Sequence, residues 1–93
     1  MKFEWDEAKR ASNFEKHRVD FSSAEVFPFH DALERPHMQG EEERIEATAL
    51  IGDRLHVMVY TWRNGIRRII SFRKANPREA KRYVETQDSN ADT

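Results

Sequence analysis

Residues 55–74 read Leu-His-Val-Met-Val-Tyr-Thr-Trp-Arg-Asn-Gly-Ile-Arg-Arg-Ile-Ile-Ser-Phe-Arg-Lys. Two runs rich in β-branched and aromatic residues flank Asn64-Gly65, and Asn-Gly in this context is the strongest short-range signal for a β-hairpin with a type I′ turn. A two-residue turn sets the register of the two strands, so that Arg63 faces Ile66. The stretch therefore predicts an antiparallel strand pair at the centre of the fold.

This register divides the hairpin side chains between two faces, because residues opposite each other share a face. The face expected to be buried collects Val57, Val59, Ile70 and Phe72, with Thr61 and Arg68 nearer the turn. The second face collects aromatic, hydroxyl and guanidinium groups: His56, Met58, Tyr60, Trp62, Arg67, Ile69, Ser71 and Arg73. The same register places Arg63 and Arg68 on the opposite face from Tyr60 and Arg73.

The segment before the hairpin predicts an edge strand and two helices. Residues 2–5 alternate in polarity and are expected to form the short edge strand. Asp6 is a good N-cap for a helix that ends near His17. The inner stripe of this helix is expected to consist of Ala8, Ala11 and Phe14 or Glu15, with Lys9, Asn13 and Lys16 on its flanks. A brief second helix is predicted between Ser22 and Pro28.

The following residues are harder to assign. Residues 32–35 are a short strand candidate, and residues 36–42 are interpreted as an exposed loop because they contain Pro, Gly and an acidic run. Residues 44–51 are rich in apolar and β-branched side chains and predict a strand. Gly52-Asp53 is expected to turn that strand into the central hairpin.

The last predicted element is a helix. Asn76 is its N-cap, Pro77 its first residue, and Glu79 completes a pair resembling a capping box. We therefore predict one α+β domain over residues 1–86, with helices packed on a mostly antiparallel sheet. Residues 87–93 are polar and are expected to form a disordered tail.

Composition narrows the class of protein. The 93 residues leave no room for a second core, and no cysteine is present. No apolar run suits a leader or a membrane span, so we expect a cytoplasmic protein without membrane contact. Charge is segregated, with a net −6 over residues 1–53, +8 over 54–83 and −3 over 84–93. The basic segment favours a polyanionic ligand; the alternative is two solvated faces that neutralise each other.

Metal-free cleavage of a phosphodiester needs a group that removes a proton from the attacking 2′-hydroxyl, cations for the developing charge, and help for the leaving oxygen. Arginine suits the second task because its planar fork grips phosphate in two places. Trp62 suits base stacking, and His17 is a good proton carrier near neutral pH. The alternative is that a helix covers the mixed face and that Lys16 and His17 only offset the helix dipole.

The sequence has no motif for a metal site, a Gly-rich phosphate loop or a Ser-His-acid site. His30, Asp31 and His37 do not have the spacing of known metal ligands. Neither a Gly-rich phosphate loop nor the nucleophile-elbow motif of Ser-His-acid enzymes occurs. We therefore expect no metal and no cofactor.

A series of short sequence motifs follows a specific order and spacing over about residues 3–85. They are Phe3-Glu4-Trp5-Asp6, Lys9, Asn13, Lys16-His17, Val19, Phe21, Glu43-Arg44, Val59-Tyr60-Thr61-x-Arg63, Arg68-Ile69-Ile70-Ser71-x-Arg73-x-Ala75, Glu79 and Tyr83. In these motifs the sequence resembles the BrnT toxins of bacterial type II toxin–antitoxin systems. It departs from them at Arg18, where the family usually has Gly, at Phe72, where a small residue is common, and over residues 29–40. Arg18 is therefore expected at positive φ after the helix.

The resemblance implies a RelE-like fold and a metal-independent endoribonuclease that arrests translation by cutting RNA. It also implies a partner, a BrnA-like ribbon-helix-helix antitoxin, through which the complex would contact promoter DNA. The alternative is a non-catalytic module that only binds RNA or an antitoxin. A direct DNA-binding regulator is disfavoured because the sequence has no helix-turn-helix pattern.

With this function in view, we predict the site residues. The predicted catalytic residues are Arg73, Tyr60, His17, Arg63 and Arg68, and the predicted substrate contacts are Lys16, Arg44, Arg67, Trp62 and Ser71. Tyr60 and Arg73 rank first because the predicted register puts them on one face. Arg68 has a structural alternative, in which its charge is paired with Glu79 or Glu43.

Overall fold

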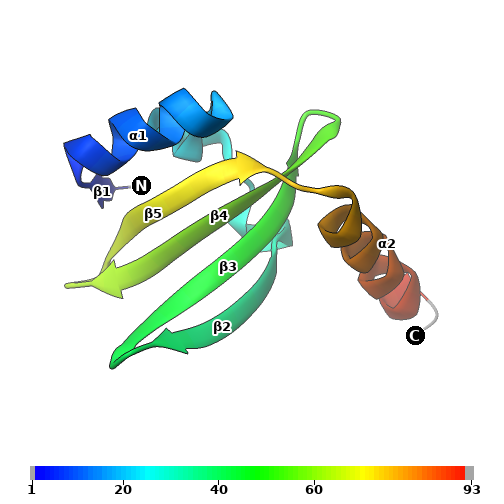
Figure 1. Cartoon of the computed structure of the whole chain (residues 1–93). Helices are drawn as coiled ribbons and strands as arrows, with labels where there is room; N and C mark the ends of the chain where they lie inside the picture. Colours follow the sequence, from blue (N-terminus) through cyan, green and yellow to red (C-terminus); the bar gives the residue numbers. More distant parts are fainter. Residues whose placement is uncertain (1, 92–93) are drawn as a thin grey trace.

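The chain forms a five-stranded sheet with the strand order β1-β5-β4-β3-β2 in a computed structural model that describes residues 2–91, with side chains to residue 87 (Figure 1). The strands are β1 (Phe3–Trp5), β2 (Leu33–Gln39), β3 (Glu42–Ile51), β4 (Arg54–Arg63) and β5 (Ile66–Lys74). The pair β1–β5 is parallel and the other three pairs are antiparallel. The predicted α+β class, with a mostly antiparallel sheet, is confirmed.

Helices lie on one face and at two edges of this sheet. They are α1 (Glu7–His17), the 3₁₀ turns η1 (Phe21–Val26) and η2 (Phe29–Asp31), and α2 (Pro77–Ala91). In Figure 1, α1 runs beside β5, η1 and η2 lie behind the sheet, and α2 stands at the right. The helix α2 continues into the segment predicted to be a disordered tail, and residues 92–93 lie outside the described part. The limits of the domain stay a prediction.

Two-residue turns connect the consecutive strands from β2 to β5. Asn64 and Gly65 have φ angles of 53° and 75°, so the predicted type I′ turn is confirmed. The loop predicted over residues 36–42 is wrong, because these residues end β2, turn at Gly40 and begin β3. Pro36 fits into β2 because this strand is the edge of the sheet and needs a ladder of hydrogen bonds on one side only.

A β-bulge interrupts the central hairpin. The predicted register holds from the turn up to the pair Tyr60–Ile69, but Val59 then pairs with Ser71 and Val57 with Arg73. Ile70 is the extra residue, and the predicted register beyond it is wrong. Because side chains alternate between the faces of a strand, one inserted residue moves every later residue of β5 to the other face.

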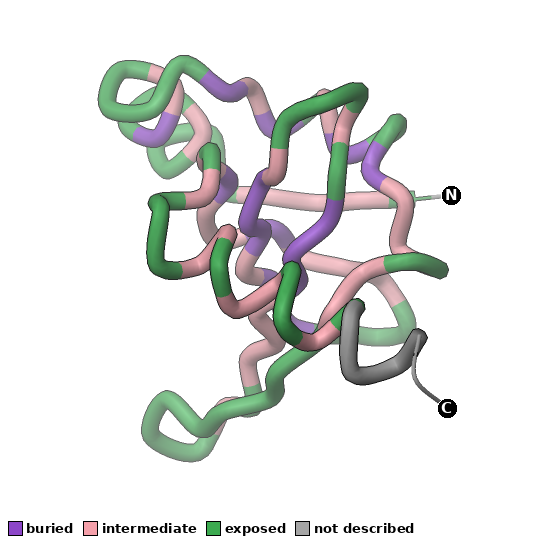
Figure 2. The backbone as a smooth tube through the Cα atoms, turned by 90° about the vertical axis from the view of Figure 1, so that its right-hand side faces the viewer, coloured by how far each residue is buried: buried purple, intermediate pink, exposed green. Residues whose placement is uncertain are grey.

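The core lies between the sheet and the two 3₁₀ turns. Its largest fully buried side chains include Tyr60, Met58, Ile69 and Phe72 from the sheet and Phe21 from η1. Figure 2 shows the buried stretches gathered in the middle of the molecule, with exposed hairpin ends around them. The prediction of the core face is therefore wrong except for Phe72, which the bulge moves to the same face as Met58.

We call the side of the sheet that meets η1 and η2 the core face. The opposite side, which carries Val57, Val59 and Thr61 of β4, is the outer face. Val57 was predicted to be in the core and is buried, but it is buried on the outer face, apart from the main hydrophobic cluster. The outer face is the one on which the bulge places Ser71 and Arg73.

A single buried side chain joins α1 to the sheet. The predicted inner stripe is wrong, since Ala8 and Ala11 are exposed and Asn13 is the buried residue of α1. The Asn13 Nδ2 group donates to the main-chain oxygens of Phe72 (2.7 Å) and Val19 (3.1 Å), and Oδ1 accepts from the Phe72 N–H (3.1 Å). Since β1 pairs only with residues 67–69 of β5, Asn13 completes the edge of β5 beyond them.

Candidate functional site

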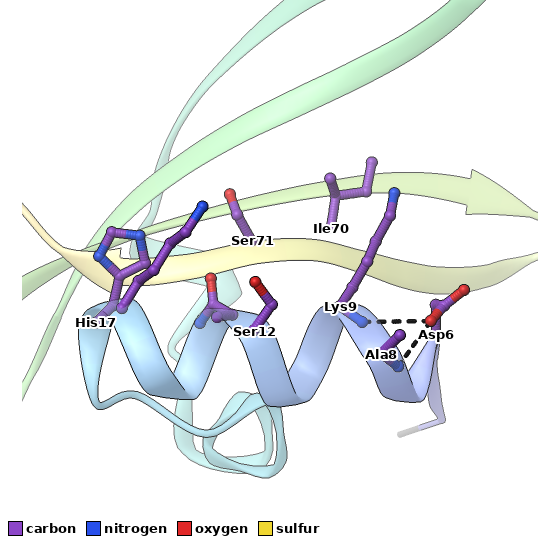
Figure 3. A pocket seen from close by; sticks show the side chains of 9 residues that line it. Asp6, Ala8, Lys9, Ser12, His17, Ile70 and Ser71 are labelled. Carbon is purple, nitrogen blue, oxygen red and sulfur yellow. Dashed lines mark hydrogen bonds between the residues drawn. The ribbon is translucent and has the colours of Figure 1, made fainter.

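A groove runs between α1 and β5, and its position follows from the Asn13 anchor and the bulge. It has a volume of about 440 Å³ and is lined by Asp6, Ala8, Lys9, Ser12, Asn13, Lys16, His17, Ile70 and Ser71. Figure 3 shows Lys9 and His17 extending from the helix toward the strand, with Ser71 on the strand across from Ser12. We call it the α1–β5 groove. It brings together the predicted site residues Lys16, His17 and Ser71.

The groove is electropositive. Lys9, Lys16 and His17 are exposed, and none of them forms an ion pair with another residue of the described chain. The carboxylate among the lining residues belongs to Asp6, which caps α1 by accepting from the N–H groups of Ala8 and Lys9. The cations of the groove are thus available to an anionic ligand.

The predicted arginines lie on the outer face, near the groove and beyond it. The bulge puts Arg73 on the same face as Arg63 and Arg68, so the predicted separation of Arg73 from these two residues is wrong. Arg44 of β3 lies on this face too, because its neighbour Ile45 pairs with Tyr60 on the core face. Four predicted site arginines therefore share one surface.

Each of these arginines is held by a carboxylate. Arg68 binds Glu4 at 2.6 Å, so its predicted pairing with Glu79 or Glu43 is wrong. Arg63 and Arg44 share Glu42, with an N–O distance of 3.1 Å in each pair. Their hydrogen bonds lower the pKa of the Glu42 carboxyl. A phosphate that approaches these arginines must compete with a carboxylate already in place.

Arg73 has the most complete pairing of the four. Its Nη1 and Nη2 atoms donate to the two oxygens of Glu79 at 2.7 and 2.8 Å. Glu79 also forms the predicted capping box, since it accepts from the Asn76 N–H while its own N–H donates to Asn76 Oδ1. The hydrogen bonds from Arg73 and then from Asn76 lower the pKa of Glu79. Arg73 therefore connects the end of β5 to the start of α2.

Tyr60 is separated from Arg73, against the prediction that the two share a face. Its ring is buried on the core face, and its hydroxyl donates to the Glu34 carboxylate. Burial and the bond to Glu34 raise the pKa of the Tyr60 hydroxyl. A raised pKa makes this group a poorer proton donor near neutral pH.

Trp62 and Arg67 form a second cluster, on the core face near the hairpin turn. The Arg67 guanidinium carbon lies 3.9 Å from the ring centre of Phe29, 4.5 Å from that of Trp62 and 5.2 Å from that of Tyr60. The Trp62 side of this cluster is accessible, because Trp62 is 48% exposed. Neither residue lines the α1–β5 groove.

Six of the groove residues were not predicted as site residues, and three of these are polar residues of α1: Lys9, Ser12 and Asn13. The spacing of Lys9 and Lys16 by seven residues, with Ser12 and Asn13 between them, puts all four on one side of a helix. We interpreted Lys9, Asn13 and Lys16 as the flank of an apolar stripe. The helical spacing was thus visible in the sequence, but the sequence did not show that the polar side of the helix faces β5.

Two properties concern the whole described chain. Among the side chains of residues 2–87, no group of three or more His, Asp or Glu is placed to hold a metal ion. Within residues 2–91, no helix is long and apolar enough to cross a membrane.

Comparison with known proteins shows the family to which the chain is similar. Residues 5–79 match the family model described as "Ribonuclease toxin, BrnT, of type II toxin-antitoxin system". The matched region contains all of α1 and the whole sheet except the first two residues of β1. No curated protein and no solved structure matches the chain.

Proposed function

The chain belongs to the BrnT family of ribonuclease toxins of type II toxin–antitoxin systems, and we propose that it cuts RNA in the α1–β5 groove. The observation that carries this proposal is that Lys9, Lys16 and His17, which form no ion pair in the described chain, line the groove together with Ser71. Such a set suits a phosphodiester, since cations bind the phosphate and a histidine transfers protons near neutral pH.

In the proposed reaction His17 removes the proton from a ribose 2′-hydroxyl. The 2′-oxygen attacks the adjacent phosphorus, and the bond from phosphorus to the 5′-oxygen of the next nucleotide breaks. That oxygen takes up a proton from solvent water, and His17 returns its proton to the solvent, so the products are a 2′,3′-cyclic phosphate and a 5′-hydroxyl. Lys9 and Lys16 stabilise the charge that develops on the phosphate oxygens, and Ser12 and Ser71 donate hydrogen bonds to them. This chemistry needs no metal ion.

Other predicted site residues have different roles in this proposal. Arg68 and Arg73 flank the groove on the outer face and would attract neighbouring phosphates while they stay paired with Glu4 and Glu79. Trp62 stays a candidate for base stacking outside the groove. Tyr60 is left out of the reacting site, because its hydroxyl is held by Glu34 on the other face.

The proposed partner is a BrnA-like ribbon-helix-helix antitoxin. An acidic segment of the antitoxin would cover the basic groove and block access of RNA, since complementary charge steers and orients such contacts. Promoter DNA would bind to the antitoxin part of the complex. We place the free toxin in the cytoplasm, where cleavage of RNA would arrest translation.

The test is the chemistry of the product ends. Purified RNA is incubated with the chain in EDTA, beside the same RNA with a 2′-deoxy nucleotide at the mapped cut. The proposal predicts 2′,3′-cyclic phosphate ends and loss of that cut in the deoxy RNA. Cleavage that stops in EDTA, or that leaves 5′-phosphates, would contradict the mechanism. Binding without cleavage would favour the non-catalytic alternative.

A further inference from the structure

A second cationic pocket lies on the outer face, at the other edge of the sheet from the α1–β5 groove. It has a volume of about 360 Å³ and is lined by Arg35, Pro36, His37, Glu46, Glu79 and Arg82. We call it the β2–α2 pocket. None of these residues is part of the proposed cleavage site.

The strand register explains why the pocket opens on the outer face. Arg35 of β2 pairs with Glu46 of β3, and His37 pairs with Arg44. These residues alternate with Ala47 and Ile45, which belong to the core. Arg35 and His37 are two residues apart, so both side chains project to the outer face.

The helix α2 supplies the third basic side chain of the pocket, which is Arg82. Arg73 holds Glu79 by two hydrogen bonds and thereby fixes the first turn of α2 beside the sheet. Arg82 follows Glu79 by three residues, so it lies on the same side of the helix and lines the pocket.

The charges of the pocket favour an anion. Arg35, His37 and Arg82 form no ion pair within the part of the chain that the structure describes. Glu79 is already neutralised by Arg73, which leaves Glu46 as the opposing carboxylate. Two arginines therefore face one carboxylate, and the His37 ring adds a hydrogen-bond donor beside them.

The pocket and the groove lie on one continuous surface. Strands β5 and β2 are separated by three inter-strand spacings, or about 14 Å. On the outer face, Arg44 of β3 lies between the strands of the two sites, and Arg68 and Arg73 lie on β5 beside the groove. A ligand that reaches both must be an extended polyanion, because a single phosphate group cannot span this distance.

We infer that the β2–α2 pocket binds a second phosphate of the RNA strand whose cleavage occurs in the α1–β5 groove. This inference rests on the proposed function. The strand crosses the outer face from β5 to β2, and Arg35 and Arg82 hold its backbone without reading its sequence. The toxin therefore binds single-stranded RNA long enough to cross the sheet more tightly than it binds short fragments.

The test compares RNA lengths. Binding of a 2′-O-methyl trinucleotide and of a 2′-O-methyl dodecamer, which cannot undergo 2′-hydroxyl attack, is measured against salt concentration. The chains are the parent, Arg35→Ala/Arg82→Ala, and the matched control Arg54→Ala/Lys81→Ala. Arg54 and Lys81 are exposed and line neither site, so the control removes the same charge. Circular dichroism confirms that all three chains are folded.

The pocket variant is expected to lose affinity for the dodecamer more than for the trinucleotide. Its slope of log affinity against log salt should become less steep by about 0.7, since one neutralised phosphate of a single strand contributes about this much. Equal behaviour of pocket variant and control would overturn the inference. So would unchanged RNA binding together with escape from the antitoxin, which would assign the pocket to that protein. If the parent bound neither RNA, the proposed function itself would fail.

Discussion

Asn13 sets the geometry of the groove although it carries no charge. Its amide binds both main-chain groups of Phe72, the residue between Ser71 and Arg73, and so fixes the distance from α1 to β5. Asn13→Ala leaves these buried groups and the Val19 oxygen without a partner. We expect a loss of about 2–4 kcal/mol in the free energy of unfolding, measured by urea denaturation.

Hydrogen exchange gives the local readout for the Asn13 variant. The Phe72 amide should exchange faster in Asn13→Ala than in the parent, beyond the change that global stability explains. Ser12→Ala is the control, since Ser12 is the exposed neighbour in the same helix turn. Equal stability of the two variants would show that Asn13 does not anchor α1.

Arg18 ends α1 in a conformation that suits glycine. Its φ is 59°, as expected from the sequence, and its N–H donates to the Phe14 oxygen at 2.8 Å. A non-glycine residue in this region raises the free energy of the folded state by about 1–2 kcal/mol. Glycine avoids this strain, but it loses more conformational entropy on folding, which offsets part of the gain. We predict that Arg18→Gly raises the free energy of unfolding by about 0.5 kcal/mol.

The control for this variant is Arg18→Ala. Alanine keeps the positive φ but removes the guanidinium that lies 5.6 Å from the Phe14 ring centre. It should therefore lower the free energy of unfolding slightly. If the Arg18→Gly chain were no more stable than the Arg18→Ala chain, the helix end would not be strained.

The ion pair of Arg73 and Glu79 predicts a dependence of stability on pH. The hydrogen bonds lower the pKa of Glu79 in the folded state below its ordinary value of 4.5. The carboxylate thus stabilises the fold above about pH 4.5, and this contribution is lost as pH falls through the lowered pKa. The difference in unfolding free energy between the parent and Glu79→Gln should shrink below about pH 4.5.

Denaturation midpoints between about pH 3 and pH 7 measure this difference. Glu25→Gln serves as the control because Glu25 is exposed on η1 and forms no ion pair in the described chain. A difference that stayed constant over the whole range would contradict a lowered pKa for Glu79.

At the scale of elements, the segments with local signals were predicted well. Asp6 at α1, the Asn64-Gly65 turn and the capping box at Asn76 each depend on residues within a few positions of one another. The start of β2 was predicted by the strand candidate at residues 32–35, but its second half was missed because its acceptance of Pro36 depends on its place at the sheet edge. That place is set by the other strands and cannot be read from residues 33–39 alone.

The bulge at Ile70 has the largest consequence for the site. No local feature distinguishes Ile70 from Ile69, and the extra residue is accommodated because Asn13 takes over the hydrogen bonds of β5 next to it. Without the bulge Ser71 and Arg73 would lie on the core face. Deletion of Ile70 is therefore expected to reduce RNA cleavage at least tenfold more than Ile70→Ala, which keeps the residue count.

Initial cleavage rates of the two Ile70 variants test this point, with the folded state of each checked by its near-ultraviolet circular dichroism. If the deleted chain is folded and as active as Ile70→Ala, the bulge does not position the site. A deleted chain that fails to fold would show that the bulge is required for the hairpin, and the comparison then moves to Ile70→Gly, which keeps the count but loosens the bulge.

For the whole molecule, the segregation of charge in the sequence indicated a polyanion ligand, and the resemblance indicated the family that the comparison shows. His17, Lys16 and Ser71 were predicted individually, and the structure brings them together in one groove. Their grouping could not be predicted, because it depends on the bulge and on the side of α1 that faces β5. The separation of Tyr60 from Arg73 has the same origin.

The central claim is that the α1–β5 groove performs the cleavage. The most direct measurement is the initial rate of RNA cleavage in EDTA for the parent, Lys16→Ala/His17→Ala and the control His30→Ala/Lys74→Ala, whose residues are exposed and outside the groove. The account predicts a loss of about 10²- to 10⁴-fold for the groove variant, with the control close to the parent. Equal rates for the two double variants would place the active site elsewhere.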